Sequence, residues 1–231
     1  MSTFMPSTST TLLIKESLAT ALREKIVSGE IEPGQVIVEG KWAAQFGVAQ
    51  GSVREALNIL AYEGFVQKIP GHRARVTRLT REDVQQTYQV RSFLEGLAAR
   101  LVVERQADLS GIEAACADLQ QAVASVDVQG IVDADLRFHL LLCEQSGNRI
   151  LLEHARRLLM PLFAFVLMRV YTNNQGSQPW LATSILHTRI LDVLRLGDPF
   201  VAEQFVMRVT SIFAAGAYDE WEAKVPPPPA S

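Results

Sequence analysis

Two histidines and an aspartate in the C-terminal half of the chain have the types and spacing that metal binding requires. Asp135 and His139 stand four residues apart, so a helix would place the carboxylate and the imidazole on one face. His187 lies further along, inside the apolar stretch 185–191. Imidazole and carboxylate groups are common ligands of divalent metals. These residues alone leave two interpretations open: a metal site, or histidines satisfied by hydrogen bonds within an apolar core.

A second group of polar residues, near the N-terminus, has the pattern of a DNA-reading helix. A glycine-bounded turn opens a helix that begins with Gln50, Ser52 and Arg54 and continues with apolar residues. Such starting positions face base edges and phosphates in a helix-turn-helix. An arginine can pair with guanine or clamp a phosphate, a glutamine can pair with adenine, and a serine can bind a phosphate oxygen. For Arg54 the alternative is a structural salt bridge to Glu39 or Glu55.

The elements around this helix predict a winged helix-turn-helix over residues 12–78. We expect, in order, helices at 12–28, 39–46 and 52–63 and β-prone runs at 65–69 and 74–77. The turn-rich residues between the two runs are typical of a hairpin, whose tip presents Gly71, His72 and Arg73. A winged helix can also serve as a protein-interaction module, and this alternative stays open.

The rest of the chain predicts an all-helical domain over residues 79–222. Thr80 followed by Asp83 resembles a capping box at its start. We expect helices at 81–105, 108–125, 128–146, 148–171, 178–196 and 198–221. Residues 1–11 and 223–231 are expected to be disordered tails, the second rich in proline. The expected fold class is therefore mainly α: a winged helix-turn-helix of three helices and a hairpin, followed by a helical bundle.

The composition favours a globular, non-membrane protein with a small basic excess at its N-terminal end. Apolar residues make up 48% of the chain, and the most apolar stretch, 158–170, is interrupted by a proline and an arginine. The net charge of −3 is uneven, because residues 12–78 carry nine Lys/Arg against seven Asp/Glu. Cys116 and Cys143 lie inside helical patterns, and residues 1–11 lack the basic start and apolar run of a signal peptide, so we expect a cytoplasmic protein.

Residues 18–76 resemble the DNA-binding domain of the GntR family of bacterial transcription regulators. The matching residues are Arg23, Ile26, Gly29, Pro33-Gly34, Glu39, Ala43-Ala44, Phe46-Gly47-Val48, Val53–Leu57, Leu60, Glu63–Val66 and Gly71. The chain departs from the family at Ala49–Ser52, where Ser-Arg-Thr-Pro is usual, and at Gly40, where an arginine is common. Lys41 is expected to compensate in part as a phosphate contact. The predicted DNA contacts are Lys41, Gln50, Gly51, Ser52, Arg54, Gly71, His72 and Arg73.

Residues 81–216 resemble the FCD domain, the effector-binding domain of the FadR subgroup of this family. The matching pieces are Tyr88–Arg91, Leu94-Glu95, Ala98–Leu101, Asp135–His139, Ser146–Asn148, His187, Ile190 and Gly197-Asp198. Many members bind a divalent metal of the Zn, Ni or Mn type through an Asp, a His four residues later and two further His. Asp135, His139 and His187 fall on the first three positions, and Val209 stands in the fourth. The resemblance implies a three-ligand site completed by water or by the effector's carboxylate, or a chain that has lost its metal.

The resemblance also implies what the protein does. It would be a ligand-responsive regulator, most often a repressor in this family, that binds a pseudo-palindromic operator in double-stranded DNA as a homodimer. The effector would be a small organic acid anchored by Arg91, and a salt bridge between Arg91 and Glu95 is the alternative. Two other functions stay open. One is a metal-responsive regulator; the other is a metal-dependent enzyme, which the lack of a well-placed general base and of a phosphate-binding loop disfavours.

Overall fold

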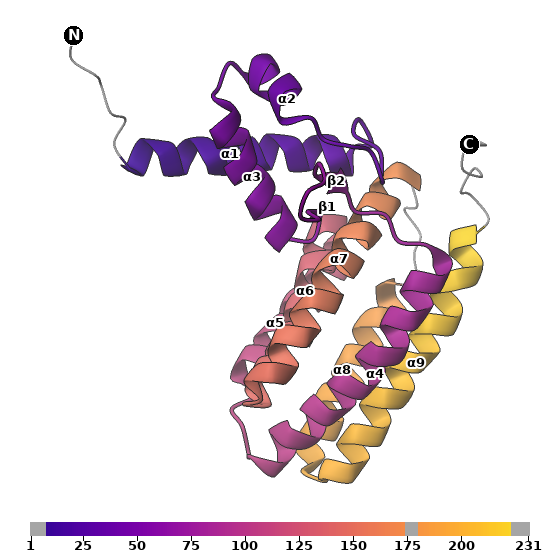
Figure 1. Cartoon of the computed structure of the whole chain (residues 1–231). Helices are drawn as coiled ribbons and strands as arrows, with labels where there is room; N and C mark the ends of the chain where they lie inside the picture. The colour runs from indigo at the N-terminus through magenta and orange to yellow at the C-terminus, as the bar shows by residue number, and fades with distance from the viewer. Residues whose placement is uncertain (1–7, 174–179, 223–231) are drawn as a thin grey trace. The chain divides into compact units, whose positions relative to one another are not determined.

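The computed structural model describes residues 8–173 and 180–222 (Figure 1). The expected C-terminal tail, 223–231, lies outside the described residues. Helix α1 spans Thr8–Val27, so it begins inside the segment 1–11 that was expected to be a tail. Within the described residues, no helix combines the length and the apolarity that a bilayer crossing requires.

The chain divides into two compact units. One holds the residues up to Arg78 together with Phe163–Thr172, and the other holds Leu79–Leu162 and the residues from Asn173 on. The first contains α1, then α2 (Glu39–Phe46), α3 (Gln50–Tyr62), β1 (Val66–Gln67) and β2 (Arg75–Val76). The strands pair antiparallel, with Val66 opposite Val76, and Val36 forms an isolated bridge to Arg75. Three helices and a hairpin confirm the predicted winged helix-turn-helix.

The core of this unit follows the apolar spacing of its helices. Leu22 and Ile26 of α1, four residues apart, are fully buried, as are Val53 and Leu57 of α3. The four-residue spacing places each pair on one helix face, so α1 and α3 pack by these faces. The turn between α2 and α3 is made by Gly47, whose φ of 65° lies in the left-handed region that glycine adopts most readily. This core fixes how the start of α3 is presented.

The two helices of the helix-turn-helix both begin without a side-chain cap. Val38 precedes α2 and Ala49 precedes α3, and neither side chain can accept a hydrogen bond. Their backbones are nevertheless extended, with φ/ψ of −95°/106° and −69°/147°, which is the conformation of an N-cap residue. The cap geometry is therefore present while the capping oxygen is missing.

The second unit is all-helical over its described residues, as predicted. Its helices are α4 (Arg81–Glu104), α5 (Ser110–Ser125), α6 (Val128–Gln145), α8 (Trp180–Leu196) and α9 (Pro199–Glu222), together with α7 (Arg149–Asn173) apart from Phe163–Thr172, which belongs to the first unit. The capping box at the start of α4 is confirmed: the Asp83 backbone N–H donates to Thr80 Oγ1 at 3.1 Å, and the Thr80 N–H donates to Asp83 Oδ2 at 2.8 Å.

Helix α4 packs against α6, α8 and α9. Figure 1 shows it alongside α8 and α9. Its approach to α9 is closest at Gly96, where a methyl group would collide with Cγ of Met207 and lie 3.1 Å from the Glu203 carbonyl oxygen. Only a residue without a side chain allows this spacing. The buried face of α4 that results carries two charged residues, Arg91 and Glu95.

Candidate metal centre and nucleic-acid interface

The structure brings Asp135, His139 and His187 together. Oδ1 of Asp135 lies 3.1 Å from Nε2 of His139 and 2.9 Å from Nε2 of His187, and the two Nε2 atoms are 3.2 Å apart. The first two residues come from α6 and the third from α8, and both histidines are buried. Three potential ligand atoms therefore converge on one point.

The outer nitrogen of each imidazole is fixed by a group that can only accept a hydrogen bond. Nδ1 of His187 lies 2.7 Å from the Thr183 carbonyl oxygen, and Nδ1 of His139 lies 3.0 Å from Oε2 of Glu95. The Thr183 carbonyl therefore favours the hydrogen on Nδ1 of His187, and the charge of Glu95 favours it on Nδ1 of His139; a neutral ring of this form has a lone pair on its inner Nε2. A partner behind a ligating histidine is the usual arrangement at metal sites.

Glu95 stays ionised because of Arg91. Nε of Arg91 donates to Oε1 of Glu95 at 2.6 Å, and both side chains are buried. Burial would raise the pKa of Glu95, but Arg91 and His139 outweigh it and lower that pKa to about 2. The Tyr88 ring covers the guanidinium, 5.1 Å from its centroid. Arg91, the expected effector anchor, is thus 6% exposed and engaged with Glu95.

The converging atoms fit a divalent cation. Two imidazole lone pairs and a carboxylate oxygen about 3 Å apart repel one another unless a positive charge lies between them. Ligands 2.0–2.2 Å from a metal and at right angles to each other would be separated by about 3 Å, close to what is observed. Oδ1 of Asp135 is buried and accepts no well-formed hydrogen bond from the described residues. The three atoms are spaced as neighbouring ligands of one divalent cation would be.

A proton is the alternative positive charge. Burial and Arg91 lower the pKa of His139, but Glu95 and Asp135 raise it more, so the net shift is upward. Asp135 responds in the opposite direction: burial raises its pKa, and the two imidazoles lower it well below its ordinary value. The cluster therefore attracts a cation of either kind.

Helix α9 supplies no fourth imidazole. Val209, the position expected to depart from the family pattern, is 8% exposed and offers no ligand atom. The adjacent Thr210 directs its hydroxyl to Oε2 of Glu95 at 3.4 Å. This turn of α9 therefore supports the carboxylate behind His139. The sequence places Glu95 one helical turn after Arg91 and within the segment that resembles the FCD domain, but no sequence signal predicts its position behind His139.

The start of α3 presents Arg54 in a bidentate ion pair. Its Nε and Nη2 atoms donate to the carboxylate of Glu39, with the shortest distance 2.7 Å, and this contact raises the pKa of Arg54. The arginine side chain is still 57% exposed, and Nη1 is not part of the pair. The two roles weighed for Arg54 are thus compatible, because Glu39 orients a guanidinium that still has a free edge for DNA.

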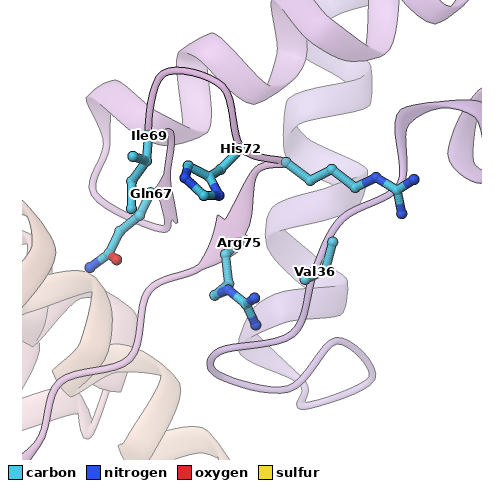
Figure 2. A pocket seen from close by; sticks show the side chains of 6 residues that line it. Val36, Gln67, Ile69, His72 and Arg75 are labelled. Carbon is cyan, nitrogen blue, oxygen red and sulfur yellow. The ribbon is translucent and has the colours of Figure 1, made fainter.

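The other predicted DNA contacts lie on α2, α3 and the hairpin. Lys41, Gln50 and Gly51 are exposed and Ser52 is half-buried; the hairpin-tip residues Gly71, His72 and Arg73 are all exposed. A hollow of about 400 Å³ on the hairpin is lined by Val36, Gln67, Ile69, His72, Arg73 and Arg75 (Figure 2). Arg75 is held at its edge, because its Nη1 donates to the Gly34 carbonyl oxygen at 2.6 Å. Cationic side chains on a concave wing suit a phosphate backbone.

Comparison with known proteins agrees with this architecture. The family model described as bacterial regulatory proteins, gntR family, matches residues 14–76, and that of the FCD domain matches residues 86–210. The uncharacterized HTH-type transcriptional regulator YdhC of Bacillus subtilis (strain 168) is 29% identical over 192 residues, which cover 80% of this chain and 83% of that protein.

A second relative is the probable D-xylose utilization operon transcriptional repressor of Paenarthrobacter nicotinovorans. It is 26% identical over 196 residues, which cover 83% of this chain and 84% of that protein. Among solved structures, E. coli McbR/YncC shares the fold with a TM-score of 0.69 and 21% identity, covering 90% of this chain and 99% of that one. The chain belongs to the GntR family of DNA-binding transcriptional regulators, which are not enzymes, and carries a C-terminal FCD domain.

Proposed function

We propose that this regulator is a repressor that binds a pseudo-palindromic operator as a homodimer and is modulated by a small organic acid in its helical domain. The observation that carries the DNA-reading part is the Arg54–Glu39 pair at the exposed start of α3. An arginine held in a fixed orientation can pair with guanine O6 and N7 without losing further side-chain freedom. Gln50, Gly51 and Ser52 contribute on the same helix start, with Lys41 and the hairpin tip Gly71–Arg73 on phosphates.

A second copy of the chain would read the second half-site of the operator. Val90, Phe93 and Leu97 follow one another at helical spacing on α4 and are 50%, 65% and 37% exposed. This stripe lies on a helix that packs against α6, α8 and α9 with other residues. We assign it to the dimer, because a single winged domain reads one half of a palindrome and a two-fold contact needs a self-complementary surface.

The helical domain would take its effector at the metal cluster. Three protein ligands leave at least one coordination position that a carboxylate oxygen fills well. The bound metal would hold the acid, while Glu95 and Arg91 fix the ligating imidazole. A relative named as a probable repressor of D-xylose utilization supports the sign of regulation.

Footprinting of the purified protein on its own promoter region, with and without chelator and with a panel of small organic acids, tests this function. We expect a protected pseudo-palindrome with half-sites about one helical turn apart, released by one class of acid and only when the metal is bound. Protection that no acid changes but that chelation abolishes would favour a metal-responsive regulator instead. Binding without sequence preference would overturn the proposal.

A further inference from the structure

Gly40 is a helical glycine that its own backbone does not require. It is the second residue of α2, and its φ is not in the left-handed region that favours glycine. A side chain at this position would meet Gln50, because an added Cβ would lie 2.9 Å from Nε2 and 3.8 Å from Cδ of that residue. The amide of Gln50 therefore occupies the space that any other residue at position 40 would fill.

The position of this amide matters because a glutamine recognises a base through both the NH₂ group and the carbonyl oxygen of its amide. The NH₂ group donates and the carbonyl oxygen accepts, and recognition of adenine uses both at once. Gln50 is the first residue of α3, and its side chain is exposed. A displaced amide presents its donor and acceptor to a different place in the groove.

The first two residues of α2 thus act on the two longest polar side chains at the start of α3. Glu39 binds Arg54 through both carboxylate oxygens. Gly40 leaves the room in which Gln50 lies. Glu39 orients Arg54 through an ion pair, and Gly40 affects Gln50 by leaving space for its amide.

We propose that Gly40 is a positioning residue for base reading, so that positions 40 and 50 form one specificity element. This rests on the DNA-reading role of α3. A methyl group at position 40 displaces only the flexible end of an exposed side chain, and alanine suits a helix better than glycine. The change therefore alters which base is preferred and leaves the fold intact.

A double-mutant cycle on the full-length protein tests the proposal. Wild type, Gly40→Ala, Gln50→Ala and the double variant are each used to select operators from a randomised library, and the preference at every base position is measured. For Gly40→Ala we expect discrimination at the position read by Gln50 to fall about fivefold or more. The melting temperature should not fall. In the Gln50→Ala background, Gly40→Ala should have no further effect on base preference.

A matched control is Gly111→Ala in α5, where the added methyl group meets only Leu141, at 3.7 Å. It should leave base preference unchanged. The proposal is overturned if Gly40→Ala keeps the wild-type preference, or if its effect persists undiminished without the Gln50 amide. A wild-type protein that selects no sequence at all would instead overturn the DNA-reading role, so the two failures are distinguishable.

Discussion

Arg54 of α3 is bound by both carboxylate oxygens of Glu39 on α2, while more than half of the arginine side chain remains in contact with solvent. A pair that served stability alone would gain little at such an exposed site, because solvent screens it. Orientation of the guanidinium is the effect that this geometry explains.

Arg54→Ala should therefore lower specific operator affinity at least tenfold. Arg54→Lys should recover little of it, since an ammonium group cannot form the bidentate contact. The melting temperature should shift by only a few degrees in both variants. Fluorescence anisotropy with operator and scrambled DNA, together with thermal unfolding, measures the two effects; a large drop in melting temperature with unchanged affinity would contradict this account.

Replacement of a single residue should stabilise the DNA-binding unit. Ala49 has the backbone of an N-cap but no oxygen, so Ala49→Ser should raise the free energy of unfolding by about 1 kcal/mol. Ala49→Val, which adds bulk without a hydrogen-bond acceptor, is the control and should not stabilise. Urea unfolding followed by circular dichroism measures both, and equal effects of the two variants would speak against capping.

Metal binding should depend on Glu95 as well as on the three ligands. Elemental analysis should find a divalent metal with the wild type and none with His187→Ala. Glu95→Gln keeps every ligand atom but weakens the acceptor behind His139, so it should reduce metal affinity roughly 10–100-fold. The exposed Glu82→Gln on the same helix is the control. If Glu95→Gln binds the metal as tightly as the wild type does, Glu95 has no role in metal binding.

The metal-free protein should lose stability in acid through Glu95. Its pKa is about 2 when folded against an ordinary value of 4.5, so the ionised form stabilises the fold above pH 4.5. That contribution, on the order of 3 kcal/mol, is lost as the pH falls from 4.5 towards 2. Urea unfolding in the presence of a chelator, repeated across this pH range, should show the free energy of unfolding falling more steeply for the wild type than for Glu95→Gln. That variant is already destabilised at neutral pH, because Arg91 has lost its charged partner.

The exposed stripe on α4 predicts the oligomeric state. Phe93→Glu should convert a dimer to a monomer in light scattering coupled to size-exclusion chromatography, because a charge cannot be buried in a self-complementary apolar contact. Gln85→Glu places the same charge on another exposed face of α4 and should leave the mass unchanged. A monomeric wild type would contradict the homodimer itself.

Local patterns were sufficient to predict the elements of this fold. The Thr80–Asp83 box marks the start of α4, and Gly47 marks the end of α2, within a residue of the structure. Where local signals were weak, the prediction was less accurate: α1 begins at Thr8, because Ser and Thr near a helix start do not distinguish a first turn from a tail.

The residues that could bind a metal were predictable from the sequence, but the residues that support them were not. Asp135 and His139 share a helix face by spacing alone, but the support of Glu95 for His139 comes from another helix, more than forty residues away in sequence. Such a contact depends on how α4 packs, which the Gly96–Met207 approach determines. Likewise, the space between Gly40 and Gln50 exists only once α2 and α3 are packed together.

Because α2 and α3 begin without a side-chain cap, operator DNA can supply the hydrogen-bond acceptors that the protein lacks there. A helix start lacking a side-chain acceptor leaves backbone N–H groups directed outward, and a phosphate oxygen is a stronger acceptor for them than a serine hydroxyl. DNA would therefore act as the missing cap for the first backbone N–H groups of each helix as it docks. A permanent oxygen at position 49 would stabilise the free protein and at the same time compete with the phosphate for these donors.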